Sequence, residues 1–372
     1  MPARPRDEHH RASTPLELMF DLIMVVAVAQ AAAGLHHGLG ADGHALDAVR
    51  TYAAAFFALW WAWMNFSWFA SAYDNDDVPY RLTVFVLMVG ALVFAAGTAD
   101  FARGDLLLPV AGYVLMRIAM IALWLRAAHH DAKGRRIARR YALGIFVVQC
   151  GWVALIKLPI TLLWPGFIVL VVLELLVPVW AEHGGETPWH AGHIAERYGL
   201  LTLIVLGEAV SSLSLGVAAA HEGGGWDVER LASVAGGLLI LFSMWWIYFD
   251  RPSQHMLNSQ RGAFIWGYGH YFVFGAAAAV GAGLAAQMEH PHEVAAAWAV
   301  AVAAAVYLFT SWALHVYSRC VPRHEFWLAP LAVIALLLCP LLGGAWSTPL
   351  AGAVLVGLLV AKGWLRARTI AA

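Results

Sequence analysis

The chain has 372 residues, of which 61% are hydrophobic and 13% are charged, and its formal net charge is −1. A soluble domain carries about 25% charged residues, so this composition excludes an ordinary soluble protein. The near-zero net charge gives no support for nucleic-acid binding. The charges fall in short stretches between long apolar runs, which is the pattern of a polytopic α-helical membrane protein. We therefore predict an all-α bundle of transmembrane helices in the lipid bilayer.

The N-terminal segment Met1–Thr14 is polar and contains three arginines. It has no short apolar region followed by a small-residue cleavage site, so we expect no cleaved signal peptide. The three cysteines of the chain show no CxxC spacing, so we expect neither a disulfide framework nor a metal knuckle. The sequence contains no Walker or dinucleotide-binding fingerprint, and we expect no cofactor.

Twelve apolar segments are long enough to cross a membrane as helices. Two of the divisions between them depend on short breaks, at 158–165 and at 343–348. The predicted spans are 16–36, 46–70, 81–99, 106–128, 141–159, 163–181, 196–220, 231–249, 262–286, 294–317, 326–343 and 347–365.

Lysine and arginine are distributed unevenly between the two sides of these spans. If the N-terminus is cytoplasmic, 18 of the 23 Lys and Arg residues lie inside and 4 lie outside. Because cytoplasmic loops carry an excess of Lys and Arg, we predict that both termini are cytoplasmic. The run Lys133–Arg140 carries much of this bias and is expected to lie beside anionic lipid.

The two halves of the chain resemble each other. The second predicted span ends in Trp60–Trp63 and the eighth in Trp245–Phe249, and Arg81 and Arg261 precede similar motifs of the third and ninth spans. Six spans per half give both halves the same orientation, so we predict two parallel six-helix repeats. The predicted organisation is a tail (1–15), a first repeat (16–181), a cytoplasmic connector (182–195) and a second repeat (196–372).

An ionisable residue, Glu208, lies in the middle of the seventh span. It is twelve residues after Glu196, where this span is predicted to begin, which corresponds to about 18 Å in a hydrocarbon core about 30 Å thick. A charged group at that depth costs several kcal/mol unless it is paired, protonated or hydrated. Glu208 is therefore a candidate ion- or proton-binding residue.

The first span begins with two acidic residues. Thr14, Pro15 and Glu17 form a capping-box sequence, and Asp21 follows Glu17 by four residues, so both acids share one helix face. Capping explains Glu17 as well as ion binding does, whereas Asp21 lies deeper among apolar residues and is the stronger ion-binding candidate. Gln30, nine residues further on, is a further candidate ligand and can equally hydrogen-bond another helix.

Three more polar residues lie inside predicted spans. Arg117 in the fourth span and Glu174 in the sixth can form a structural ion pair. The alternative is a pair between Arg117 and Glu208, which would connect the two halves. His270 in the ninth span is either a hydrogen-bonded core histidine or a side chain that gains a proton near neutral pH.

A short segment before the seventh span holds three possible metal ligands. His190, His193 and Glu196 lie within seven residues, which permits a metal site, and Glu196 is also a candidate ion ligand. The segment lacks the HExxH pattern, so structural or capping use is the simpler interpretation.

The segments that carry these acids resemble a known family. Pro15–Gln30 resembles the Pro-x-Glu-Leu-Phe-Phe-Asp-Leu-Val-Phe opening of bacterial low temperature requirement A proteins, with Met19 and Met24 at positions where phenylalanine is usual. His193–Thr202 and Trp245–Asp250 fit the same family pattern. The resemblance covers nearly the whole chain and implies a multi-pass protein of the bacterial inner membrane. The family name describes a growth phenotype in the cold and implies no biochemical activity.

Three classes of function fit these observations. The leading hypothesis is a transporter or channel for a small cation, a proton or a proton-coupled solute, in which Asp21 and Glu208 bind the ion and His270 or Arg117 tunes their charge. One alternative is a non-catalytic membrane sensor or scaffold for cold adaptation. The other is a membrane-embedded enzyme that acts on lipid through the segment His190–Glu196. An enzyme is less expected than a non-enzyme, and a homo-oligomer is compatible with the sequence.

Overall fold

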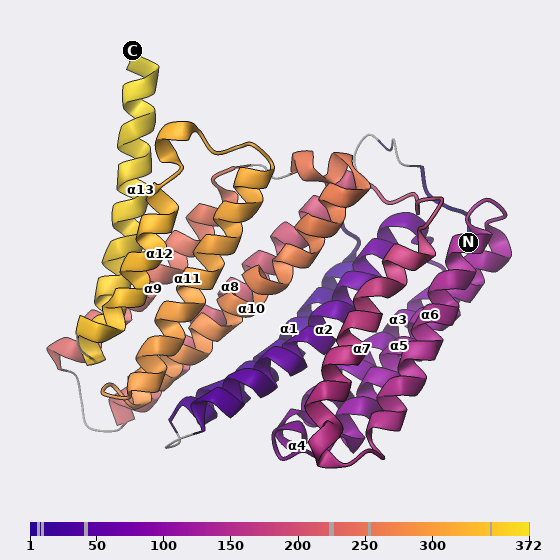
Figure 1. Cartoon of the computed structure of the whole chain (residues 1–372), viewed down its shortest axis with the longest axis horizontal. Helices are drawn as coiled ribbons and strands as arrows, with labels where there is room; N and C mark the ends of the chain where they lie inside the picture. Colours follow the sequence, from indigo (N-terminus) through magenta and orange to yellow (C-terminus); the bar gives the residue numbers. More distant parts are fainter. Residues whose placement is uncertain are drawn as a thin grey trace. The chain divides into compact units, whose positions relative to one another are not determined.

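The computed structural model describes residues 1–5, 8, 11–40, 44–222, 227–251, 254–342 and 344–371. All regular elements in these residues are helical (Figure 1). The α-helices are α1 (Pro15–Leu39), α2 (Ala45–Tyr73), α3 (Val78–Ala96), α4 (Thr98–Ala102), α5 (Leu107–His130), α6 (Arg135–Leu155), α7 (Leu163–Ala181), α8 (Ala191–Glu222), α9 (Val228–Phe249), α10 (Gln260–Glu289), α11 (Val294–Tyr317), α12 (Leu328–Leu338) and α13 (Ser347–Ala371). The 3₁₀ helices are η1 (Ile160–Leu162), η2 (Gln254–Asn258), η3 (Arg323–Glu325), η4 (Cys339–Leu342) and η5 (Gly344–Trp346).

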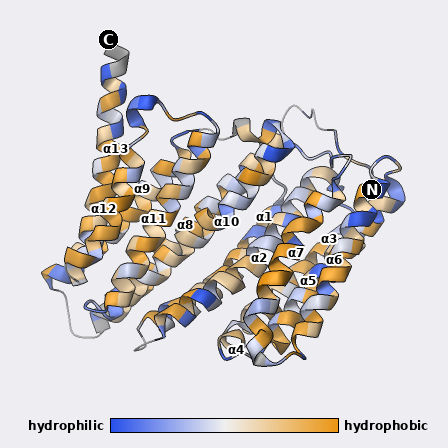
Figure 2. Cartoon of the chain, viewed as in Figure 1, coloured by the Kyte–Doolittle hydropathy of each residue, from blue (hydrophilic) through white to orange (hydrophobic). Residues whose placement is uncertain are grey.

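Ten helical segments in the described part of the chain are long and apolar enough to cross a membrane. Figure 2 shows apolar residues along these helices. The helices α2 and α6 occupy the positions of two predicted spans but are not among the ten. The all-helical fold is therefore confirmed for the described residues, and its ten candidate spans indicate a multi-pass membrane protein. Twelve spans in two parallel repeats stay a prediction.

The helix ends differ in places from the predicted spans. Helix α8 begins at Ala191, five residues before the predicted start, because His190 caps it: its Nδ1 atom accepts a hydrogen bond from the His193 amide at 3.1 Å. The helices are interrupted at both short breaks seen in the sequence. At 158–165 the 3₁₀ helix η1 precedes α7, and near 343–348 the 3₁₀ helices η4 and η5 precede α13. Gly343, at the second of these breaks, lies outside the described residues.

The chain forms two compact units, and unit 1 comprises Met1–Ala31 and Ala55–Gly199. In unit 1, α3 packs against α5, α5 against α6, and α6 against α7. The contact between α3 and α5 depends on Gly90 and Gly112. A Cβ atom on Gly90 would lie 2.8 Å from the Gly112 carbonyl oxygen, and one on Gly112 would overlap the backbone nitrogen of Phe94. Glycine therefore allows the two helix backbones to touch.

Unit 2 comprises Ala32–Ala54 and Leu200–Ala372. Helix α10 packs against α11, α9 against α13, and α12 against both α11 and α13. Small residues again permit close approach, since a Cβ atom on Gly281 of α10 would lie 2.8 Å from the Cα atom of Ala209 in α8.

Candidate functional site

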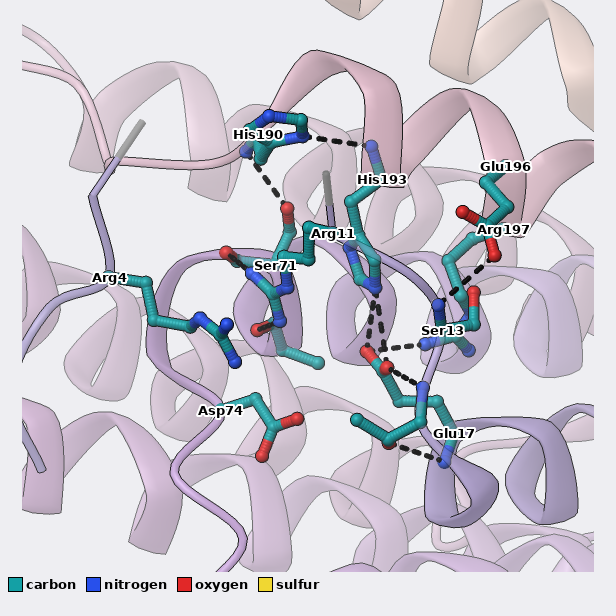
Figure 3. Close-up of polar contacts among 12 residues, drawn as sticks. Arg4, Arg11, Ser13, Glu17, Ser71, Asp74, His190, His193, Glu196 and Arg197 are labelled. Carbon is teal, nitrogen blue, oxygen red and sulfur yellow. Dashed lines mark hydrogen bonds and ion pairs between the residues drawn. The ribbon is translucent and has the colours of Figure 1, made fainter. Parts of the chain in front are cut away.

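Four buried ionisable side chains meet in unit 1, and we call them the acid–base cluster: Glu17, Asp21, His193 and Arg197. All four have 0% relative exposure. Glu17 and Asp21 are four residues apart on α1, and His193 and Arg197 are four residues apart on α8. Each pair therefore lies on one helix face, and the acidic face of α1 meets the basic face of α8. Figure 3 shows the Glu17, His193 and Arg197 side chains with their neighbours.

Arg197 connects the two acids. Its Nη1 atom lies 3.0 Å from Glu17 Oε1, and its Nη2 atom donates a hydrogen bond to Asp21 Oδ1. Trp63 of α2 donates its indole N–H to the same Asp21 oxygen at 2.7 Å. The other oxygen, Asp21 Oδ2, is buried and has no hydrogen-bond partner among the described residues. One Asp21 oxygen is thus held in place, and the second remains an available acceptor.

Glu17 has two roles in the structure. It forms the predicted capping box, because its Oε2 atom accepts from the Thr14 amide at 2.8 Å and its own amide donates to Thr14 Oγ1 at 3.3 Å. The same carboxylate lies beside His193, with 3.2 Å between Glu17 Oε1 and His193 Nε2. Glu17 therefore caps the helix as predicted and also belongs to a buried charge cluster, whereas ion binding by Glu17 stays a prediction.

The N-terminal segment adds a second buried cation. Arg11 donates hydrogen bonds to the carbonyl oxygens of Ala70 (2.6 Å) and Ser71 near the C-terminus of α2, and the Ala70 oxygen also accepts from the Asp74 amide at 3.0 Å. Burial lowers the pKa of Arg11. Asp74, just after α2, is also buried. Its burial and, next, the Glu17 carboxylate raise the pKa of Asp74 to about 6.

The histidine-rich segment before α8 has structural contacts. Because His190 Nδ1 accepts from the His193 amide, its Nε2 atom carries the hydrogen and donates to the Glu8 carbonyl oxygen at 3.0 Å. Glu196 accepts a hydrogen bond from the Ser13 amide at 3.1 Å. These contacts attach the N-terminal segment to the start of α8, and Figure 3 shows the one between Ser13 and Glu196. No group of three or more metal-binding side chains occurs in the described part of the chain.

Arg117 forms a separate buried ion pair within unit 1. Its Nη2 atom lies 2.6 Å from Glu174 Oε2. The Glu174 carboxylate also accepts hydrogen bonds from Trp61 (2.9 Å), Tyr113 (2.8 Å) and Trp152 (3.2 Å). The sequence leaves Glu174 and Glu208 open as partners of Arg117, and in the structure its partner is Glu174. The pair is neutral as a whole and connects α5 to α7.

The remaining predicted residues do not belong to the acid–base cluster. Glu208 lies in unit 2, about midway along α8, half-buried and without an ion pair to any described residue. His270, also in unit 2, is hydrogen-bonded through both ring nitrogens, to the Trp266 carbonyl oxygen (2.7 Å) and to the Tyr248 hydroxyl (2.9 Å). Gln30 is exposed on α1. His270 is therefore a hydrogen-bonded residue of the helix core, and its gain of a proton near neutral pH stays a prediction.

Sequence reasoning misses Arg197 and Trp63 as site residues. Arg197 enters the prediction as one of the positive charges that set orientation and as part of the family pattern His193–Thr202, and Trp63 enters it as part of the repeat motif Trp60–Trp63; neither is named there as a site residue. A usable signal exists for Arg197, since it follows His193 by four residues, just as Asp21 follows Glu17. Matching spacings of acids and bases on two helices indicate faces that can pair. No comparable sequence signal distinguishes Trp63.

A charge network in unit 2 provides a contrast. Asp250 at the end of α9 binds Arg366 (2.6 Å) and Lys362 (3.0 Å) of α13, and Glu325 of η3 binds Arg366 (2.8 Å) and Arg251 (2.5 Å). Burial opposes ionisation of Asp250, but hydrogen bonds from Arg366 and Lys362 lower its pKa overall. This network contains three cations and two acids, and each acid is paired with a cation. It therefore has no excess negative charge, and its contacts are suited to joining helices.

Comparison with known proteins identifies the family. Residues 12–361 match the family described as bacterial low temperature requirement A protein. An uncharacterized protein of Rhizobium meliloti (strain 1021) is similar to this chain, with 25% identity over 371 residues that cover 93% of this chain and 87% of the relative. The family match includes every residue of the acid–base cluster. The resemblance seen in the sequence is confirmed, and the chain belongs to the bacterial low temperature requirement A family.

Proposed function

We propose that this protein is a membrane transport protein for a small cation or a proton-coupled solute, and that the acid–base cluster binds the cation or proton. The observation that carries the proposal is the charge of the cluster. Two carboxylates face one guanidinium, so the cluster has a net charge of −1 when both acids are ionised and His193 is neutral. Arg11 and Asp74 add one charge of each sign and leave this excess unchanged.

A single excess negative charge in a buried site costs several kcal/mol. One proton or one monovalent cation removes that cost, so the site favours binding of one such ion. Two acceptors are placed for it. Asp21 Oδ2 is buried and has no hydrogen-bond partner among the described residues, and the same is true of His193 Nδ1. Because His193 Nε2 lies 3.2 Å from Glu17 Oε1, it carries the hydrogen in the neutral ring and donates to that carboxylate. A proton taken up at Nδ1 would therefore give an imidazolium that lies against a carboxylate.

We propose further that the chain lies in the bacterial inner membrane, crosses it twelve times in two parallel repeats and has both termini in the cytoplasm. The capped start of α1 at Pro15 then places the acid–base cluster near the cytoplasmic end of the first span. An ion entering from that side reaches the cluster without crossing the membrane centre.

The test is ion and proton flux in proteoliposomes under imposed pH, Na⁺ and K⁺ gradients. Asp21→Asn is the informative variant because asparagine can still accept hydrogen bonds from Trp63 and Arg197. Arg197 also keeps Glu17 as its carboxylate partner. The variant cluster is neutral, so we expect a folded protein whose flux is at least tenfold lower. Asp47→Asn is the matched control, since Asp47 is an exposed acid that pairs with Arg50.

Two outcomes would overturn the proposal. One is wild-type flux in monodisperse Asp21→Asn protein, which would make the acid–base cluster purely structural. The other is the absence of flux from the wild type under every gradient, which would favour the sensor or scaffold alternative. Glu208→Gln should be measured in parallel, because Glu208 is half-buried and unpaired among the described residues. A loss of flux in Glu208→Gln alone would indicate that the ion binds at Glu208 in unit 2 and not at the acid–base cluster.

A further inference from the structure

A basic pocket lies at the N-terminal end of α6 in unit 1. It is an open cavity of about 510 Å³ whose lining includes Lys133, Arg135, Arg136, Arg139, Arg140 and Trp180. Trp180 comes from the end of α7, and the Arg140 guanidinium lies 5.7 Å from the centre of its ring. The pocket thus combines five positive charges with one aromatic wall, a combination suited to an anion at a membrane surface.

The charges of this pocket have no ion-pair partner among the acids of the described residues. Arg135 donates to the carbonyl oxygen of Ala128 at 3.0 Å, and Arg140 donates to that of His183 at 2.8 Å. These backbone partners carry no charge. Within the described residues, none of the five cations has a carboxylate at ion-pair distance. Arg136 and Arg139 are exposed, so their guanidinium groups are available to an external anion.

An apolar surface continues from the pocket along the same face of α6. Arg136, Arg139 and Leu143 follow one another at the spacing of one helix face, and Phe146 and Val147 extend that face by another turn. Leu143 lines the pocket, and all three apolar side chains are more than half exposed. Helix α6 packs between α5 and α7, both of which are candidate membrane spans. The exposed apolar face is therefore positioned to contact acyl chains.

We infer that the basic pocket binds the phosphate group of an anionic phospholipid, with Arg136 and Arg139 as its principal ligands. Guanidinium groups bind phosphate through paired hydrogen bonds, and Trp180 covers one side of the headgroup. The acyl chains lie along Leu143 and Phe146. Charge at one end and an exposed apolar stripe below it match the chemistry of a phospholipid better than that of a soluble phosphate.

The experiment is lipid binding to the purified full-length protein in neutral detergent, measured by native mass spectrometry. The probes are phosphatidylglycerol, phosphatidylcholine, glycerol 3-phosphate and inorganic phosphate. The test variant is Arg136→Gln with Arg139→Gln, and both side chains are exposed, so folding should not be affected. The control is Arg50→Gln with Arg103→Gln, which also removes two exposed positive charges, in this case partners of Asp47 and Asp100.

We expect phosphatidylglycerol to bind the wild type and the control alike. A cation near an anionic membrane surface contributes about 1 kcal/mol, so the test variant should bind roughly thirtyfold more weakly. Unchanged binding in the test variant would overturn the inference, and so would equal weakening in both double variants. Binding of glycerol 3-phosphate or inorganic phosphate as tight as that of phosphatidylglycerol would overturn the lipid assignment, because the acyl chains would then contribute nothing.

Discussion

At the scale of single residues, Asp21 and Arg197 differ in what their loss would do. Removing one partner of a buried ion pair costs about 3–5 kcal/mol, mainly because the other charge is left buried and unpaired. Arg197 contacts two acids, so its removal would leave both Glu17 and Asp21 uncompensated. Neutralising Asp21 instead leaves Arg197 paired with Glu17. A functional test on the acidic side of the cluster therefore separates ion binding from folding.

We expect Asp74 to make the stability of the protein depend on pH. Its pKa is raised to about 6 by burial and then by Glu17, whereas the ordinary pKa of an unfolded aspartate is about 3.9. The folded state therefore binds the proton more tightly, and the contribution of Asp74 to stability is greatest below pH 4. As the pH rises from about 4 to 6, this contribution falls by roughly 2–3 kcal/mol.

We expect Asp74→Asn to remove this decrease. The variant and the wild type should unfold at similar temperatures near pH 4, and the variant should be more stable at pH 8 by about 2 kcal/mol. Asparagine can still accept the hydrogen bond that Asp74 accepts from the Asp76 amide. Thermal unfolding of detergent-solubilised protein from pH 4 to pH 8 measures the effect, with Asp47→Asn as the control for the chemical change. Parallel pH profiles of wild type and Asp74→Asn would contradict the prediction.

At the scale of elements, the sequence predicts the helices well and their partners poorly. A helix such as α1 is specified locally, by Thr14 and Glu17 at its start and by a long apolar run after it. The pairing of Asp21 with Arg197 joins residues 176 positions apart, and no local signal selects that partner. The same limit applies to Arg117, for which the sequence leaves two acids open and the packing of α5, α6 and α7 selects Glu174.

The contact between α3 and α5 gives a prediction for Gly112→Ala. The added methyl group would overlap the backbone nitrogen of Phe94 and lie 2.7 Å from the Gly90 carbonyl oxygen. Backbone atoms cannot move aside as a side chain can, so the helices must separate. Overpacking of this kind costs about 1–3 kcal/mol, and we expect a lower unfolding temperature in detergent.

Gly207→Ala is the control for the change of residue type. Gly207 also lies inside a long helix, α8, but a Cβ atom there has no neighbour within 4 Å. Alanine is favoured over glycine in helices by up to about 1 kcal/mol, so this variant should be as stable as the wild type or more stable. Shifts of the same sign and size in the two variants would show that Gly112 is not a point of close helix contact.

At the scale of the whole molecule, the orientation in the membrane is the feature most open to a direct test. Ala102 and Ala132 lie near opposite ends of α5, a candidate membrane span, and both are exposed. With the three native cysteines replaced by alanine, Ala102→Cys and Ala132→Cys provide a matched pair of labelling sites.

We expect a membrane-impermeant maleimide to label Ala102→Cys in intact spheroplasts. The same reagent should label Ala132→Cys only after lysis, because the excess of Lys and Arg predicts a cytoplasmic location for that end of α5. The opposite pattern would reverse the predicted orientation of every span. Labelling of both positions in intact cells would show that α5 does not cross the membrane.

The long separation between the acids of α1 and Arg197 has a consequence for biosynthesis. A ribosome that adds 5–20 residues per second needs on the order of 10–35 s to synthesise the 176 residues between Asp21 and Arg197. During that interval α1 is already made, but its guanidinium partner does not yet exist. Until then, we expect Asp21 to be protonated or to lie at the lipid–water boundary. The contacts that Asp21 makes in the folded protein can therefore be completed only after α8 is made.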